Sequence, residues 1–227
     1  MSQAAPDYPL QFDVEYPDRN LNRLTTAFRI FVAIPILIVL SAISGASWST
    51  SDFGDTQTNT AAAAGGILFF PTLLMIVFRQ KYPRWWFDWN LQFSRFSARV
   101  TTYLALLRDE YPSTDEEQAV RLDFEYPNAQ TDLNRWLPLV KWLLAVPHYF
   151  VLIFLGLAAF ICVVVAWFAI LFTGRYPRGL FNFVVGVERW GWRVAAYAFL
   201  LITDKYPPFS LAGAAPSAPA APEPTAF

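Results

Sequence analysis

One segment of this sequence occurs twice, and the two copies lie 94 residues apart. Residues 78–103 read FRQKYPRWWFDWNLQFSRFSARVTTY, and residues 172–197 read FTGRYPRGLFNFVVGVERWGWRVAAY. In each copy an apolar run ends in basic residues, a Tyr-Pro pair follows, and an aromatic-rich helical pattern with two arginines four residues apart comes next. An EYP motif and an LNR motif also precede each copy. We therefore predict a tandem repeat, in which both halves of the chain share one fold.

The composition is typical of membrane proteins. Hydrophobic residues make up 55% of the sequence and charged residues only 15%, which is more apolar than the usual balance of soluble domains. Apolar helices of about 20 residues can cross a hydrocarbon core of about 30 Å. The predicted fold class is an all-α membrane protein, in which each half is a transmembrane helical hairpin followed by an aromatic-rich amphipathic helix in the membrane plane.

The sequence divides into five predicted parts. These are an N-terminal arm (1–18); a first repeat (19–112), with spans at about 21–43 and 61–79 and an in-plane helix at 84–107; an acidic linker (113–132); a second repeat (133–208), with spans at about 136–155 and 157–174 and an in-plane helix at 179–203; and a disordered tail (209–227). The apolar stretch of the second repeat is too long for one ordinary span, so we predict a turn near Gly156. The polar stretch 44–65 is predicted to be a flexible loop.

The basic residues predict the orientation. All 17 Lys and Arg lie outside residues 30–78, so the loop of the first hairpin carries none. By the positive-inside rule we predict four spans in the bacterial inner membrane, with both termini and the linker in the cytoplasm. In a six-span alternative the aromatic helices also cross the membrane, and the halves are inverted repeats.

Aromatic residues cluster where the apolar runs end. Seven of the ten tyrosines precede a proline, which stops a helix while the tyrosine ring suits the membrane interface. The predicted interface anchors are Tyr82, Trp85, Trp86, Trp89, Tyr176, Trp190 and Trp192.

Arginines recur on the polar side of the repeated block. A guanidinium group can hold a phosphate through two hydrogen bonds, so these residues are candidates for binding anionic lipid headgroups or an acidic partner segment. The candidates are Arg95, Arg99, Arg175, Arg178, Arg189 and Arg193. The alternative is structural: these arginines pair with acids such as Glu15 and Glu125 and fix the repeat.

Residues for catalysis or metal binding are scarce. Cys162 is the single cysteine and His148 the single histidine, so we predict no disulfide, no metal site and no cofactor. His148 lies in an apolar run, and its counterpart in the first half is Ile36, so we expect it to have a structural role. Phosphate-binding loops, zinc motifs and nucleophile elbows are absent from the sequence. The chain is therefore not expected to be an enzyme or to bind nucleic acid.

The arrangement resembles a known bacterial family. The EYP and LNR motifs, the proline-broken span and the block RYPR-x-LFxF-xx-GV-x-RW-xx-RV-x-AY at 175–197 are similar to uncharacterised integral membrane proteins defined as a domain of unknown function. The first copy departs from the block at Lys81, Trp86 and Ser94. The resemblance implies membrane residence and repeated domains, and it implies no established activity.

Two functions remain open. The first is a non-catalytic scaffold or accessory subunit that binds lipid and a protein partner, or a second copy of itself, at the cytoplasmic face. The second is a small transporter or channel built from the two repeats. The predicted spans contain few polar residues that could line a pore, which favours the first.

Overall fold

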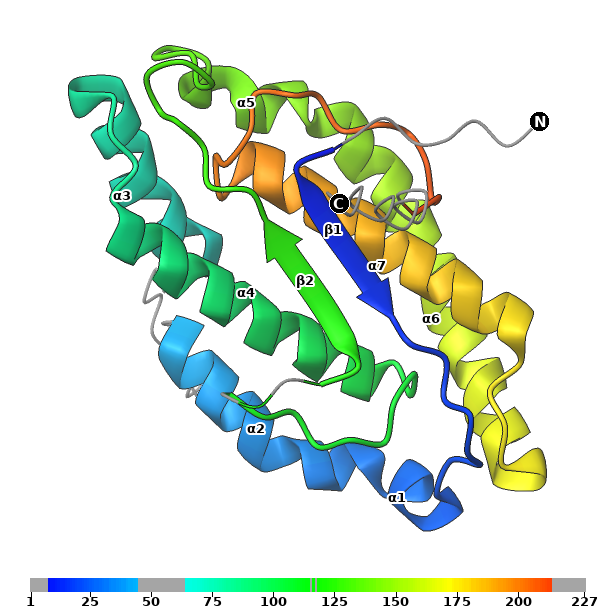
Figure 1. The fold of residues 1–227 in the computed structure, drawn as a ribbon. Coiled ribbons are helices and arrows are strands. Elements are labelled where there is room, and N and C mark those ends of the chain that lie inside the picture. The colour runs from blue at the N-terminus through cyan, green and yellow to red at the C-terminus, as the bar shows by residue number, and fades with distance from the viewer. Residues whose placement is uncertain (1–7, 45–63, 115, 117, 214–227) are drawn as a thin grey trace, which may run out of the picture.

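The structure is a computed structural model that describes residues 8–44, 64–114, 116 and 118–213. Most of the predicted loop 44–65, the start of the N-terminal arm and the end of the tail lie outside the described residues. The described part is mostly helical, as predicted, with two short strands (Figure 1). The elements are β1 (Leu10–Val14), α1 (Arg23–Ala27), α2 (Arg29–Ser44), α3 (Ala64–Arg79), α4 (Arg84–Leu104), β2 (Val120–Phe124), α5 (Pro138–Leu144), α6 (Val146–Thr173) and α7 (Arg178–Ala198).

The two strands form an antiparallel ribbon, which corrects the prediction of an all-α fold. β1 lies in the predicted N-terminal arm and β2 in the predicted linker. The reason is visible in the sequences LQFDV and VRLDF, where apolar and polar residues alternate as a half-buried strand requires. Phe12 pairs with Leu122 at the centre of the ribbon, and Asp13 pairs with Arg121. The apolar side chains point into the core, and the polar ones form an exposed outer face.

Each strand packs on the aromatic helix of the other half of the chain. β1, from the first half, contacts α7, and β2, which begins the second half, contacts α4. In Figure 1 the ribbon lies between α4 and α7, which flank it on either side. One continuous core joins Leu10 and Phe12 of β1, Leu122 of β2 and Phe181 of α7. Neither half can therefore complete its core without the other.

The apolar helices α2, α3 and α6 lie on the outside of this assembly. α6 is a single helix of 28 residues that runs through Gly156, so the turn predicted there is absent and 136–155 and 157–174 are not two spans. Glycine costs a helix only about 1 kcal/mol relative to alanine, and the residues around Gly156 are good helix formers. In the first half the corresponding apolar stretch forms two helices of 16 residues, α2 and α3. The predicted span at 21–43 also divides, because α1 ends before α2 begins.

Tyrosines of the Tyr-Pro pairs tie the two halves together. The Tyr16 hydroxyl donates to the carbonyl of Tyr176, and the Tyr126 hydroxyl donates to the carbonyl of Tyr82, each at 2.5 Å. The two hydrogen bonds correspond to each other in the two halves. In one the donor lies in the first half and the acceptor in the second, and in the other the order is reversed. The tyrosines therefore fix how the strand of one half enters the helices of the other.

The described residues with a positive φ also fall at matching positions. Gln80 and Gly174, which are 94 residues apart, precede the two Tyr-Pro pairs, and Leu106 and Leu201 follow α4 and α7. Gly174 caps α6 with φ 75°, which glycine adopts without strain. Gln80, which follows α3, also has a positive φ, of 46°, although it is not a glycine.

We predict that the ribbon is essential for stability. Phe12→Ala removes a side chain that is 3% exposed at the point where the halves meet, and such a change costs about 3 to 5 kcal/mol. Gln11→Ala, on the exposed face of the same strand, is the control and should cost little. Thermal unfolding of the purified protein in mild detergent measures both. Equal melting temperatures for the two variants would show that the strand is not part of the folding core.

Candidate functional site

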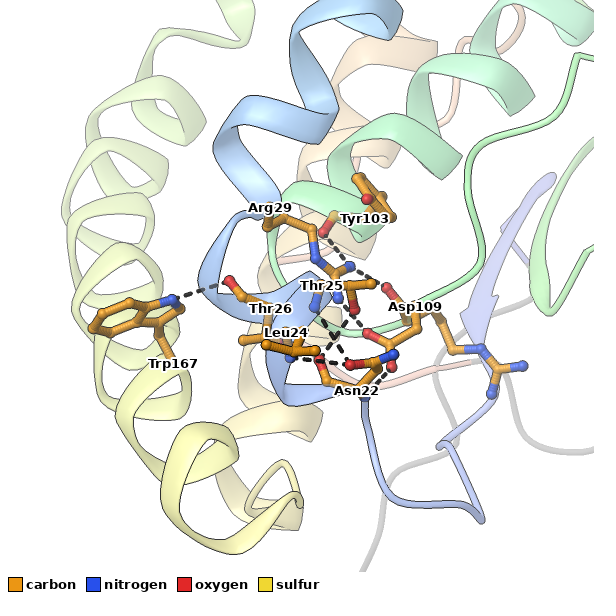
Figure 2. Close-up of polar contacts among 9 residues, drawn as sticks. Asn22, Leu24, Thr25, Thr26, Arg29, Tyr103, Asp109 and Trp167 are labelled. Atoms are coloured by element: carbon orange, nitrogen blue, oxygen red, sulfur yellow. Dashed lines mark hydrogen bonds and ion pairs between the residues drawn. The ribbon is translucent and has the colours of Figure 1, made fainter.

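Arg29 forms a buried ion pair at the start of α2 (Figure 2). Its side chain is 3% exposed, and its guanidinium group pairs with the Asp109 carboxylate. It also donates to the carbonyls of Tyr103 and Arg108 and lies 4.2 Å from the centre of the Tyr103 ring. Asp109 in addition accepts the backbone N–H of Asn22 at 2.6 Å. Arg29 therefore connects α2 to the end of α4 and to the segment that follows it.

Lys141 makes the corresponding contacts in the second half. Its ammonium group is fully buried and donates to the Thr203 carbonyl at 2.8 Å. It pairs with Asp204 at 2.6 Å and lies 5.2 Å from the centre of the Tyr197 ring. Asp204 accepts the backbone N–H of Asn134 at 2.6 Å, as Asp109 accepts that of Asn22. Both buried cations are thus paired and hydrogen-bonded, as a low-dielectric interior requires.

Two of the candidate arginines bind the ribbon. Arg189 donates from Nε to the Phe12 carbonyl at 2.8 Å and pairs with Asp13 at 2.9 Å. Arg95 donates from Nε to the Leu122 carbonyl at 2.9 Å and pairs with Asp123 at 2.6 Å. These contacts favour the structural alternative for both residues.

The other arginine of each pair holds a loop. Arg193 donates to the carbonyls of Ser210 and Ala212, at 3.1 and 2.8 Å, and so clamps the segment after α7. Arg99 donates to the carbonyl of Ser113 at 2.7 Å. Gly186 lets the clamped segment approach closely, because a Cβ there would lie 3.0 Å from Leu211.

Arg175 and Arg178 differ from these four because they are exposed at the end of the molecule where α6 gives way to α7. They line a cavity of about 250 Å³ together with residues 16–21, which leave β1. A larger open cavity, of about 740 Å³, lies beside β2 and is lined by Arg95, Arg99 and other charged residues.

The predicted interface anchors separate into two groups. Tyr82, Tyr176 and Trp190 are buried, so they cannot reach headgroups and belong to the core. Trp85 and Trp89 are exposed, and Trp86 and Trp192 are partly buried. The proline after Tyr82 and the proline after Tyr176 are the N-cap residues of α4 and α7.

His148 is buried among aromatic rings. Its Nδ1 accepts a hydrogen bond from the Trp190 indole at 3.1 Å, and its ring stacks on Phe209 with the centres 4.0 Å apart. In the described part of the chain no group of His, Cys, Asp and Glu side chains could hold a metal ion. The contacts of His148 are those of a packing residue.

Glu188 lies between α7 and α4 with a weak partner. The Thr102 hydroxyl donates to its carboxylate at 3.5 Å. Burial raises the pKa of Glu188 to about 8, and the Thr102 hydrogen bond offsets only part of this rise. Glu188 is not among the residues predicted from the sequence, and Ser94 occupies the matching position in the first half.

We predict that the buried pair of Arg29 is costly to break. Arg29→Met leaves Asp109 without its cation in the interior, which costs about 3 to 5 kcal/mol. Adding Asp109→Asn should recover part of the loss. Arg84→Met is the matched control, because the Arg84 and Asp88 side chains are 69% and 54% exposed and such pairs contribute about 0 to 1 kcal/mol. Melting temperatures in detergent compare the three variants; a loss with Arg84→Met as large as with Arg29→Met contradicts this assignment.

We predict a pH dependence that originates at Glu188. The pKa is about 8 in the folded protein and has an ordinary value of 4.5, so the folded state holds the proton more tightly. The contribution of Glu188 to stability is therefore fully present below about pH 4.5 and is lost as the pH rises through about 8. Glu188→Gln should flatten the profile of melting temperature against pH, while exposed Glu125→Gln should leave it unchanged. An unaltered profile in Glu188→Gln would place the titration elsewhere.

Comparison with known proteins gives one match. Residues 136–210, which include α5, α6, α7 and the segment after α7, match a family described as Domain of unknown function (DUF4389). The first copy of the predicted repeat lies outside the matched residues. No curated protein and no solved structure matches the chain. The predicted resemblance to a domain of unknown function is thus confirmed for the second half.

Proposed function

We propose that this protein is a non-catalytic membrane scaffold or accessory subunit, built from two tandem copies and seated in the bacterial inner membrane. The exposed apolar surface of α6 carries the proposal. α6 is the one described helix that is long and apolar enough to cross a bilayer, and only 6% of its most apolar part is buried. A core helix of a soluble protein would be mostly covered, so lipid is the solvent that this surface fits.

The apolar surface extends beyond α6. Large hydrophobic side chains are also exposed on α2, α3 and α5, including Phe31, Phe70 and Trp142. The outer face of the ribbon, in contrast, carries Asp13 and Arg121. The protein therefore has a lipid-facing layer of apolar helices and a polar ribbon for water, with α4 and α7 between them.

The position of the ribbon along the length of α6 supports an orientation in which α6 lies roughly parallel to the membrane plane. At about 42 Å, α6 exceeds a hydrocarbon core of about 30 Å. β1 binds Arg189 of α7, and the next residue, Trp190, donates a hydrogen bond to His148 near the start of α6. Cys162 of α6 packs, partly buried, against the hydrophobic cluster that includes Leu10 and Phe12. If α6 crossed the bilayer, the exposed charges of the ribbon would lie in hydrocarbon, at about 2.5 to 3.5 kcal/mol each. An in-plane α6 keeps the ribbon, both termini and the linker on the cytoplasmic side, as the basic residues favour.

The cavity beside β2 supports a role in recruiting a partner. Its lining carries Arg95, Arg99, Arg108 and Arg121 together with Glu15, Glu110, Glu116 and Asp123. A polar, mixed-charge hollow of about 740 Å³ on the water-facing side suits a charged segment of another protein.

Labelling of single cysteines tests the orientation. In a Cys162→Ser background, Gln130→Cys and Gly179→Cys place one thiol before α5 and one after α6, both at exposed positions. An impermeant maleimide should label both from the cytoplasmic side of inverted vesicles and neither from the outside of intact cells. Phe160→Cys, on the lipid-facing surface, should react from neither side.

Labelling of Gln130→Cys and Gly179→Cys from opposite sides would show that α6 crosses, which is the multi-pass arrangement. Recovery of the protein in the soluble fraction would reject membrane residence altogether.

A further inference from the structure

Three arginines surround one small cavity at an end of the molecule. Arg19 comes from the segment after β1, Arg175 follows α6, and Arg178 begins α7. The cavity has a volume of about 250 Å³, and Asp18 is the one acid among its lining residues. Its lining therefore carries a net positive charge, unlike the balanced lining of the cavity beside β2.

The guanidinium groups of this cavity have few internal partners. Arg175 donates from Nε to the Asn20 amide oxygen at 3.1 Å, and Arg178 lies 4.7 Å from the centre of the Tyr16 ring. Among the described residues, none of the three arginines forms an ion pair with a carboxylate, whereas Arg29, Arg95 and Arg189 each do. Their hydrogen-bonding capacity is thus available to an anion.

The cavity adjoins the lipid-facing surface. α6 ends at Thr173, and Phe168 and Phe172 in its last turns are 51% and 78% exposed. A molecule whose charged group enters the cavity could lay an apolar chain along these rings. That combination of a phosphate and an apolar chain is what a phospholipid offers.

We infer that this cavity binds the phosphate of an anionic lipid headgroup. The inference rests on the proposed membrane seating and names the ligand. A guanidinium fork matches two phosphate oxygens, while a lysine provides a point charge, so an arginine-lined cavity is suited to phosphate. Basic pockets beside membrane helices bind phosphorylated headgroups for the same reason.

The opposite end of the molecule provides a natural control. There Lys81 and Arg84 occupy the positions that match Arg175 and Arg178, and Arg84 lies 4.7 Å from the centre of the Tyr126 ring. Arg84, however, pairs with Asp88 at 3.5 Å, and the loop 127–132 carries Asp132 and no basic residue. The geometry is repeated, but the net positive charge is not.

The test compares variants at the two ends. The protein in mild detergent is titrated with phosphatidylglycerol, phosphatidylcholine or inorganic phosphate, and bound molecules are counted by native mass spectrometry. The triple variant Arg19→Gln, Arg175→Gln, Arg178→Gln should bind phosphatidylglycerol about a hundredfold more weakly, since each charge contributes about fivefold. The double variant Lys81→Gln, Arg84→Gln should bind it nearly as the wild type does. A triple lysine variant, which keeps the charge, should be intermediate.

Three results of the lipid titrations would overturn the inference. They are unchanged phosphatidylglycerol binding in the triple glutamine variant, an equal loss in the Lys81 and Arg84 double variant, and equal binding of the two lipids by the wild type. Binding of inorganic phosphate in place of lipid would assign the cavity to a soluble anion and reject the lipid. The cysteine labelling tests the orientation of the protein in the membrane independently. The lipid titration can therefore reject the lipid site while the proposed orientation is retained.

Discussion

The exchange of strands between the two halves is the constraint on which the rest of this structure depends. A two-stranded ribbon alone is marginal in water, and it becomes stable only when its apolar face is covered. Here Phe12 and Leu122 meet at the centre of the ribbon, and each strand lies on the aromatic helix of the opposite half. Arg189 and Arg95 fasten the strands by binding the Phe12 and Leu122 carbonyls. Arg95 and Arg189 of the repeated block therefore hold the two halves together.

Two buried cations also join elements of the structure, although they lie beside apolar helices. Arg29 and Lys141 lie where an outer helix meets the end of an aromatic helix, and each reaches a carbonyl and an aspartate there. A buried pair gives little net stability over an apolar replacement, but it penalises every alternative arrangement in which one charge loses its partner. The pairs thus join α2 to the end of α4 and α5 to the segment after α7.

The sequence predicted the parts of the fold that depend on local pattern. The apolar runs and the aromatic blocks predict a mostly helical chain, and the described residues are mostly helical. The ribbon was missed because five-residue strands carry a weak signal and the pairing of β1 with β2 joins residues more than a hundred positions apart. The turn predicted at Gly156 depends on the assumption that an apolar run too long for one span must fold back, whereas the run forms the single helix α6. The burial of Tyr176 depends on three-dimensional packing, whereas the sequence pattern predicts this residue at the membrane interface.

The two halves differ at positions that do not take part in the contacts they share. Both halves need the tyrosine contacts, the buried cations and the arginines that hold the ribbon, and both have them. Gly186, in contrast, corresponds to Gln92 in the first half, and the absence of a side chain at Gly186 lets Leu211 pack closely on α7. Arg19, Arg175 and Arg178 likewise make one end of the molecule basic, while Asp88 and Asp132 neutralise the other. The contacts that join the two halves are therefore present in both, whereas the charge at the two ends of the molecule differs.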